Sequence, residues 1–385
     1  MKLINFIIFL TVFFTLYGAV NFYIFIRGWQ TLPKEWIVRI PYLVIFLVLA
    51  LSYIGGRVLE RVSICAASNY LIWIGSFWLG MMVYLFFGVI LCDILRLVNW
   101  VAGAVAVPSD LYARIRQIAA VVVAVTAAAV VVAGYFNTLN PRVNTVVVEV
   151  PKGAGGLKAL DIALVTDIHL GTIIKNSRLQ QMVDMVNALR PDIVLLAGDI
   201  VDEDLAPVIQ NNLGELLCAI RSRYGVFAVT GNHEYIGGVE SASQYLSRHG
   251  VTVLRDRAVL IDNRFYLVGR EDRSSAQFTG LRRLPLAAVM KDVDRTRPVI
   301  MMDHQPYHLS EAAEHGVDLQ VSGHTHHGQL WPFNYITGLI YEVSRGFRQV
   351  GSAAVYVSCG YGTWGPPVRV GMRPEVVHIQ VRFNK

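Results

Sequence analysis

Five short motifs bring aspartate, asparagine and histidine side chains into patterns that suit metal chemistry. In chain order the motifs are Asp167-Ile168-His169, Gly198-Asp199, Gly231-Asn232-His233-Glu234, Asp303-His304 and Gly323-His324-Thr325-His326. Residues two positions apart on an extended segment point to the same side, so the first and last motifs can each hold a cation. The set mixes carboxylate and amide oxygens with imidazole nitrogens, which suits Mn, Fe or Zn better than Ca or Mg.

The elements that must position these motifs alternate between strand and helix. Each motif follows an apolar segment that predicts a buried strand, at residues 161–166, 192–197, 225–230, 298–302 and 318–322. Apolar residues at helical spacing predict helices at 177–189, 207–220 and 310–315. This alternation indicates an α/β domain whose strands are buried on both faces. Because ligands bind outside the carboxyl ends of strands in open α/β sheets, we expect the five motifs to share one edge.

The ordered set of motifs resembles the calcineurin-like metallophosphoesterase family, and the resemblance covers residues 161–385. It implies a four-layer α/β/β/α sandwich, with two mixed sheets flanked by helices. It also implies two groups of metal ligands joined by a bridging Asp199, namely Asp167, His169 and His326 for one ion and Asn232, His304 and His324 for the other. By the same resemblance, His233 lies at the leaving group. Residues 358–367 resemble a subgroup whose members carry N-terminal transmembrane helices or export signals.

The chemistry that follows is hydrolysis of a phosphate ester. Two cations about 4 Å apart can share a hydroxide and lower its pKa, which produces a nucleophile at neutral pH. They also neutralise the phosphoryl oxygens, whose charge grows in the transition state. We therefore expect a phosphomonoesterase or phosphodiesterase with a dinuclear site, two divalent ions (Mn, Zn or Fe) and a metal-bridging hydroxide. Its substrate would be a phosphate ester at a membrane surface, lipid-linked esters included.

Several of these residues also admit structural roles. Asp and Asn after a strand often cap helices, but capping does not account for four histidines at matched positions. His233 could orient a metal ligand instead of reacting. The acidic run 202–204 predicts a solvated loop. Three late residues could either contact a substrate phosphate or belong to a basic surface loop, namely Arg345, Arg348 and Tyr361.

The N-terminal third predicts a membrane region at residues 1–137. Apolar windows at 4–26, 40–56, 69–92 and 118–136 meet or approach the ~20 residues that span a bilayer. Charged residues make up 16% of the chain, against about 25% in soluble proteins. Residues 138–158 predict a linker and 159–385 the hydrolase domain. We expect an integral, multi-pass protein of a plasma or inner membrane.

The positive charges of the loops bear on sidedness, because cytoplasmic loops carry more Lys and Arg. With four spans, one side of the membrane receives Arg27, Lys34, Arg39, Arg96, Arg114 and Arg116. The other side receives Lys2, Arg57, Arg61, Arg142 and Lys152. This small excess favours an extracytoplasmic hydrolase domain.

Other functional classes receive less support. The net charge is +6 and no long basic run is present, which argues against nucleic acid as the main partner and is compatible with a lipid bilayer. Few ionisable residues lie at membrane depth, which argues against a transporter or channel. Two alternatives stay open: a pyrophosphatase for lipid-linked or nucleotide-linked sugars on the cytoplasmic face, and a non-catalytic membrane scaffold.

Overall fold

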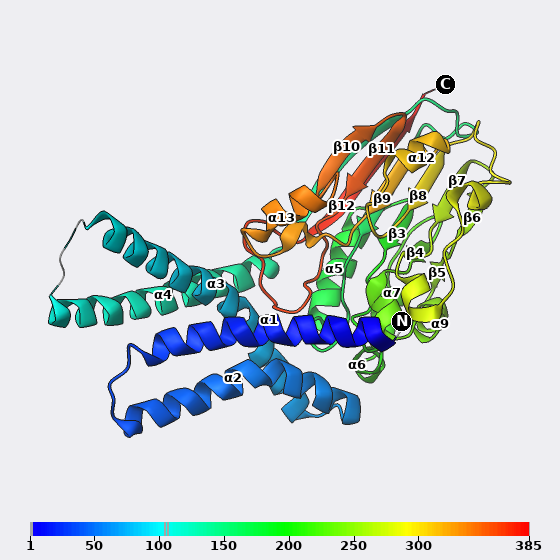
Figure 1. Cartoon of the computed structure of the whole chain (residues 1–385). Coiled ribbons are helices and arrows are strands. Elements are labelled where there is room, and N and C mark those ends of the chain that lie inside the picture. Colours follow the sequence, from blue (N-terminus) through cyan, green and yellow to red (C-terminus); the bar gives the residue numbers. More distant parts are fainter. Residues whose placement is uncertain (1–2, 104, 106–107, 385) are drawn as a thin grey trace. The chain divides into compact units, whose positions relative to one another are not determined.

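The computed structural model describes residues 3–103, 105 and 108–384, and it divides into two compact units (Figure 1). A helical unit contains the chain up to Phe136 together with Gly365–Val370. A sheet unit contains Asn137–Trp364 and the chain from Gly371 onward.

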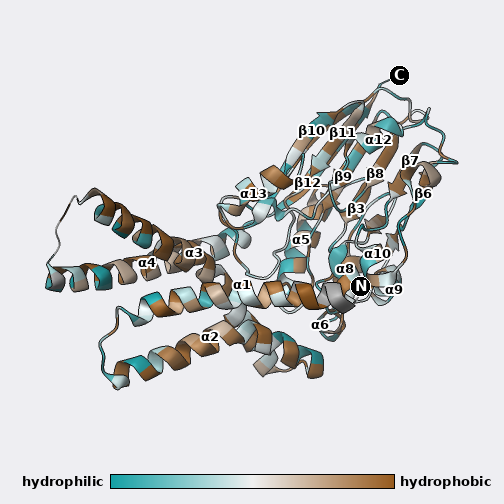
Figure 2. Ribbon diagram, viewed as in Figure 1, coloured by the Kyte–Doolittle hydropathy of each residue, from teal (hydrophilic) through white to brown (hydrophobic). Residues whose placement is uncertain are grey.

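Four long helices make up most of the helical unit: α1 (Leu3–Trp29), α2 (Trp36–Val62), α3 (Ala66–Ala102) and α4 (Ser109–Thr138). Each contains a stretch long and apolar enough to cross a membrane, and Figure 2 shows hydrophobic residues along all four. Each helix is also longer than the apolar window that predicts it. The window at 69–92 ends before Asp93, whereas α3 continues for ten residues beyond Cys92.

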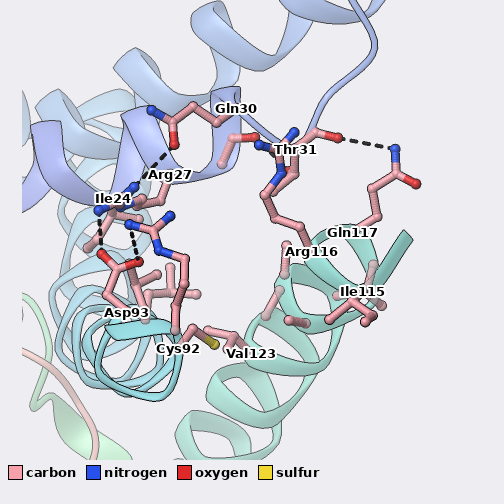
Figure 3. Close-up of a pocket in the computed structure, with 18 of the residues that line it drawn as sticks. Ile24, Arg27, Gln30, Thr31, Cys92, Asp93, Ile115, Arg116, Gln117 and Val123 are labelled. Carbon is pink, nitrogen blue, oxygen red and sulfur yellow. Dashed lines mark hydrogen bonds and ion pairs between the residues drawn. The ribbon is translucent and has the colours of Figure 1, made fainter. Parts of the chain in front are cut away.

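A charged cluster explains why α3 does not end at Asp93. The Asp93 carboxylate lies 2.5 Å from Arg27 of α1 (Figure 3). It also accepts a hydrogen bond from the Tyr23 hydroxyl at 2.5 Å and lies 3.7 Å from Arg96. Arg27, Asp93 and Arg96 border a largely apolar cavity of about 1470 Å³ among the four helices. Because the charges compensate one another, the helix can carry them without ending.

The segment 365–370 belongs to the helical unit although it lies late in the chain. The Arg369 backbone N–H donates to the carbonyl of Gly134 at 3.1 Å, and its side chain is fully buried. A Cβ at Gly134 would stand 2.6 Å from Val368, so glycine permits the close approach. Removal of the helices would expose this segment, and experiments on the full chain avoid that exposure.

The sheet unit contains two six-stranded mixed sheets. The first has the order β1-β12-β2-β3-β4-β5, with bounds Arg142–Val150, Glu375–Phe383, Ala159–Val165, Ile193–Ala197, Val226–Val229 and Val251–Val253. The second has the order β10-β11-β9-β8-β7-β6, with bounds Gly346–Val350, Ala353–Val357, Leu319–Ser322, Val299–Met302, Phe265–Gly269 and Arg257–Ile261. Neighbours from β2 to β5 are parallel, and so are β7, β8, β9 and β11.

Helices cover the outer faces of both sheets, so the unit has four layers. They are α5 (Asn176–Ala188), α6 (Ala206–Gln210), α7 (Leu213–Cys218), α8 (Asn232–Gly237), α9 (Val239–Arg248), α10 (Ser275–Thr279), α11 (Leu286–Val289), α12 (Ser310–Glu314), the 3-10 turn His326–Gly328 and α13 (Phe333–Ile340). Along β2, Leu164 faces the core between the sheets, while Ala163 and Val165 face the core under α5 and α7. The predicted α/β/β/α sandwich is confirmed.

One predicted helix is wrong. Residues 207–220 form two short helices, α6 and α7, because the chain turns at Asn211 and Asn212. Asn212 adopts a left-handed φ of 51°, which asparagine tolerates better than most residues. The Asn211 side chain also donates to the Pro207 carbonyl at 2.7 Å, which competes with continued helix.

Candidate metal centre

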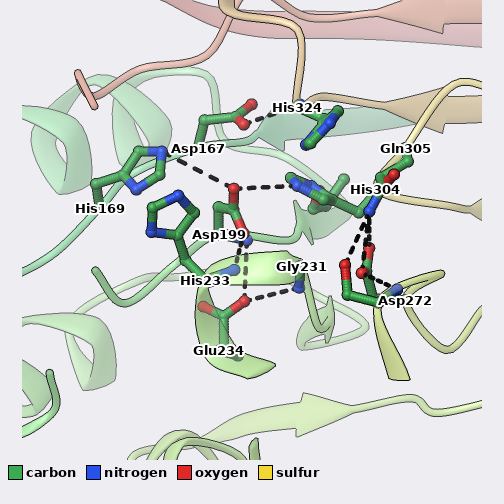
Figure 4. A network of polar contacts seen from close by, with 12 residues as sticks. Asp167, His169, Asp199, Gly231, His233, Glu234, Asp272, His304, Gln305 and His324 are labelled. Atoms are coloured by element: carbon green, nitrogen blue, oxygen red, sulfur yellow. Dashed lines mark hydrogen bonds and ion pairs between the residues drawn. The ribbon is translucent and has the colours of Figure 1, made fainter. Parts of the chain in front are cut away.

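The motif residues lie where parallel strands of both sheets end. Asp167, Asp199 and Asn232 follow β2, β3 and β4 of the first sheet, and His304 and His324 follow β8 and β9 of the second (Figure 4). His304 joins the two edges, because its Nδ1 donates to the carbonyl of Ala197 at the end of β3 at 2.9 Å. The expected common edge therefore draws on both sheets.

The backbone at this edge is strained. Five of the motif residues other than glycine have a positive φ, namely Asp167 (52°), His169 (53°), Asp199 (50°), His324 (71°) and His326 (44°). Such left-handed conformations cost of order 1–3 kcal/mol each in residues other than glycine and concentrate at functional sites. The surrounding fold holds the side chains in place at the expense of local stability.

Asp167, His169 and His326 form the first ligand group, with one potential ligand atom from each within 4.8 Å of the others. The Nε2 atoms of the two histidines lie 3.0 Å apart, and His326 Nε2 lies 3.6 Å from Asp167 Oδ1. Asp167 Oδ2 is buried and has no hydrogen-bond partner. A buried carboxylate oxygen without a partner is costly, and a cation would satisfy it.

Asp199, His304 and His324 form the second group under the same distance limit. Because His304 donates from Nδ1, Nε2 is the atom that remains for a cation, and it lies 3.1 Å from Asp199 Oδ2. Burial lowers the pKa of His324 to about 3, so that ring is neutral and can act as a ligand. The Asn232 side-chain oxygen is buried without a hydrogen-bond partner, which suits a fourth ligand.

Asp199 takes part in both regions of the site. Its Oδ2 lies 4.0 Å from His169 Nε2 as well as 3.1 Å from His304 Nε2. Burial acts against its ionisation, but the neighbouring His304 and His233 rings hold the Asp199 pKa well below its usual range. Burial instead raises the pKa of Asp167, with a further contribution from the charge of Asp199. Cations would favour the charged form of both carboxylates.

His233 lies beside these two groups and forms a third potential group with His169 and Asp199, under the same distance limit. Its ring packs edge-on against His169 with centroids 4.6 Å apart, and its backbone N–H donates to Asp199 Oδ1 at 2.9 Å. Burial alone would lower the pKa of His233, but the carboxylates of Asp199 and Asp202 raise it to about 9. A ring that carries a proton at neutral pH suits a general acid better than a metal ligand.

Comparison with known proteins identifies the family. Residues 160–328 match the family described as calcineurin-like phosphoesterase. An uncharacterized metallophosphoesterase of Aquifex aeolicus is 34% identical over 251 residues, which cover 64% of this chain and 94% of that protein. The chain belongs to the calcineurin-like phosphoesterase family.

Two further relatives differ in how much of their length the phosphoesterase spans. A Bos taurus protein named as a transmembrane protein with metallophosphoesterase domain is 32% identical over 300 residues, 74% of this chain and 67% of that protein. A Helicobacter pylori metallophosphoesterase is 33% identical over 229 residues, but the chain spans only 60% of it. The phosphoesterase is thus a hydrolase of phosphoric esters that uses divalent metal ions, and its apolar helices make it a membrane protein.

Glu234 holds the metal-binding loops of the phosphoesterase together. Its carboxylate accepts backbone N–H groups of Asp199, Ile200 and Val201 at 3.1, 2.7 and 2.8 Å, and that of Gly231 at 2.7 Å. Gly231 itself must be small, because a Cβ there would collide with the Asp199 carboxylate. These contacts indicate that Glu234 steadies the loops.

For Asp202, the prediction that the acidic run forms a solvated loop is wrong. Asp202 is only 8% exposed, and its Oδ1 lies 3.2 Å from His233 Nδ1 and 3.6 Å from His169 Nδ1. The loop that follows β3 turns back over the site and buries Asp202. The acidic residues next to Asp202 in the sequence predict an exposed loop. The position of Asp202 three residues after Asp199 was the available signal.

Asp272, which the sequence analysis did not identify, supports the second ligand group. Asp272 is 1% exposed and accepts both hydrogen bonds from the Gln305 amide nitrogen, at 3.0 and 3.1 Å (Figure 4). Nearby, Arg283 lies 3.0 Å from each Asp303 oxygen. The segment that follows β7 showed no clear sequence pattern, yet it anchors the residues on either side of His304.

Three late residues, Arg345, Arg348 and Tyr361, do not join the ligand groups. Tyr361 is fully buried, and its hydroxyl donates to the Arg178 carbonyl at 2.7 Å. Arg348 donates to the Glu342 carbonyl at 2.8 Å, and Arg345 is exposed. The backbone N–H of Tyr361 donates to the Thr166 carbonyl at 2.9 Å, and that of Gly362 donates to the Asp167 carbonyl at 2.7 Å, so this segment supports the backbone of the first motif.

Replacing Asp202 by asparagine is expected to lower kcat roughly 10- to 100-fold, as is typical when a residue that orients a site is lost. The alkaline limb of the pH profile should also move to lower pH, because the Asp202 carboxylate helps to raise the His233 pKa. Asp204→Asn is the matched control, since Asp204 caps the backbone N–H of Ala206 at 2.9 Å. An unchanged pH profile in Asp202→Asn would contradict the positioning role.

Proposed function

We propose that the phosphoesterase holds two divalent cations between its two sheets. Asp167, His169 and His326 would hold one cation, and Asn232, His304 and His324 the other, with Asp199 shared. Support comes from the two ligand groups and from the partnerless oxygens of Asp167 and Asn232. The donors are nitrogen and oxygen without sulfur, which favours Mn, Zn or Fe.

Bound cations would generate a hydroxide-like nucleophile at neutral pH and neutralise the phosphoryl oxygens. The residues of the chain supply the rest. His233 holds a proton next to the site and would deliver it to the departing oxygen of the ester. Asp202 fixes the ring of His233 at 3.2 Å, and Glu234 fixes the loops that carry Asp199 and Asn232. The reaction supported best is hydrolysis of a phosphomonoester or phosphodiester.

The substrate class we favour is a phosphate ester at a membrane surface, lipid-linked esters included. The observation that carries this proposal is the short connection between membrane helix and hydrolase: α4 ends at Thr138 and β1 begins at Arg142. A tether of this length keeps the site at high effective concentration relative to bilayer substrates.

The test uses the purified full chain, stripped of metal and reloaded with Mn, Zn or Fe. The panel contains an aryl phosphate, an aryl phosphodiester, a lipid phosphate and a lipid-linked pyrophosphate. We expect metal-dependent turnover of at least one ester, and faster turnover of the lipid ester than of its water-soluble analogue. No turnover with any metal would favour the scaffold alternative, and cleavage of the pyrophosphate alone would favour the pyrophosphatase.

We further propose that the hydrolase domain faces the extracytoplasmic side. With four spanning helices, the loops after α1 and α3 lie opposite the hydrolase domain, and they carry the larger share of Lys and Arg. A C-terminal reporter that is active only outside the cytoplasm should therefore be active. A reporter active only in the cytoplasm would reverse the assignment.

A further inference from the structure

The sheet unit contains a polar cavity that is lined by residues outside the ligand groups. Its volume is about 400 Å³, and it is lined by Asn137, Arg142, Asn144, Arg345 and residues 371–374, which include Arg373. The described residues that line it include no aspartate or glutamate. The cavity therefore presents positive charge and amide groups to whatever occupies it.

The three arginines come from three separate segments of the chain, and the pairing of β1 with β12 brings two of these segments together. Arg142 begins β1, Arg373 lies two residues before β12, and Arg345 directly precedes β10. The Arg142 backbone N–H donates to the Pro374 carbonyl at 2.9 Å, which fixes the first two segments. Among the residues that the structure describes, no carboxylate forms an ion pair with any of the three guanidinium groups.

Glu375 is the acidic residue closest in sequence to this cavity, and its carboxylate is already engaged. It is 1% exposed, and Oε1 accepts from the Ser358 hydroxyl and the Cys359 backbone N–H, each at 2.9 Å. Oε2 accepts from the Asn144 amide. These bonds turn the carboxylate into the protein and leave the arginine charges for an external anion.

Two residues that line this cavity adjoin the end of a candidate membrane span along the chain. Asn137 stands in the last turn of α4, whose spanning segment ends at Thr138, and Arg142 follows four residues later. Lipid headgroups lie at the ends of spanning helices, just outside the hydrocarbon. The larger cavity among the helices is a weaker candidate, because Arg27 and Arg96 there already contact Asp93 (Figure 3).

We propose that the three-arginine cavity binds the phosphate group of an anionic membrane lipid. Guanidinium groups bind phosphate oxygens through paired N–H donors, and three of them neutralise the group from separate directions. The cavity shares no residue with the ligand groups, so the proposal is that a lipid is held here rather than hydrolysed. Its binding would seat the phosphoesterase on bilayers that contain anionic lipid.

The test measures binding of a fluorescent phosphatidylglycerol to the full chain in neutral detergent, with chelator present so that hydrolysis does not interfere. Fluorescent phosphatidylcholine is the neutral comparison. The variant is R142Q/R345Q/R373Q, and the matched control R190Q/R221Q/R248Q removes the same charge from exposed arginines elsewhere. Thermal unfolding midpoints verify that each variant folds. If the triple variant does not fold, the single variants replace it.

We expect tighter binding of the anionic lipid than of phosphatidylcholine, a loss of at least tenfold in the cavity variant, and less than a twofold change in the control. Each basic residue near a membrane contributes about 1 kcal/mol, or roughly fivefold, so single variants should lose two- to fivefold. Wild-type binding in the cavity variant, or equal loss in the control, would overturn the proposal. Competition by inorganic phosphate at the same concentration as the lipid would also overturn it, in favour of a free-anion site.

Discussion

Replacing Asp199 by asparagine is expected to lower the hydrolytic activity at least about a thousandfold and to lower the metal content below two ions per chain. Asp199 is the carboxylate that both ligand regions share, with His304 Nε2 at 3.1 Å and His169 Nε2 at 4.0 Å. Loss of one charge-stabilising group from an active site already costs roughly 10²–10³ in rate, and this residue would serve two ions.

The fold should survive this substitution, because an asparagine oxygen can still accept the His233 backbone N–H that Asp199 Oδ1 accepts at 2.9 Å. Turnover of the most active ester, and metal content by elemental analysis, measure the effect. Asp184→Asn is the control, because Asp184 is an exposed aspartate on α5 that accepts a hydrogen bond from Gln180 at 2.8 Å. An Asp199→Asn protein with full metal content and activity within tenfold of wild type would show that Asp199 is not shared.

Replacing His233 by glutamine is expected to slow hydrolysis of an alkyl phosphate ester by about 10²–10⁴, the usual contribution of a general acid. The loss should be much smaller for a nitrophenyl ester, because nitrophenolate leaves without a proton. Metal content should not change, since His233 completes neither ligand group of the proposed pair. This contrast between leaving groups separates proton donation from a role in orienting a ligand.

The pH profile gives a second readout for His233. A general acid works only while protonated, and the pKa of about 9 keeps the ring protonated through neutral pH. Activity of the wild type on the alkyl ester should therefore fall as pH rises through that region, and His233→Gln should lack this limb. His378→Gln is the control, because His378 bonds Asp161 at 2.7 Å away from the ligand groups. Equal losses for both esters in His233→Gln would contradict the acid role.

Much of the sandwich follows from local patterns that the sequence shows directly. Buried parallel strands are short apolar runs, and the residues that follow them must emerge at the carboxyl edge, so Asp167 and His324 could be placed at that edge from the sequence alone. The mixed sheet order could not be derived from those patterns, because β12 lies between β1 and β2 only after the chain returns from its far end. That return depends on long-range pairing.

The features that sequence analysis missed depend on tertiary surroundings. Asp202 lies in a run of acidic residues, whose composition predicts solvent, but its burial beside His233 depends on a loop that folds back over the site. The predicted apolar window at 69–92 ends too early for a similar reason. A charged residue such as Asp93 indicates a membrane boundary in the sequence, but in the fold Arg27 compensates its charge and the helix continues. By contrast, the pair Asn211 and Asn212 carried a recognisable helix-breaking signal.

The central claim is that seven side chains from both sheets enclose two cations. Crystals of the full chain soaked in manganese, with an anomalous difference map, test it most directly. We predict two peaks, one beside His169 and His326 and the other beside His304 and His324, with the Asp199 carboxylate between them. A single peak, or peaks outside these side chains, would contradict the account.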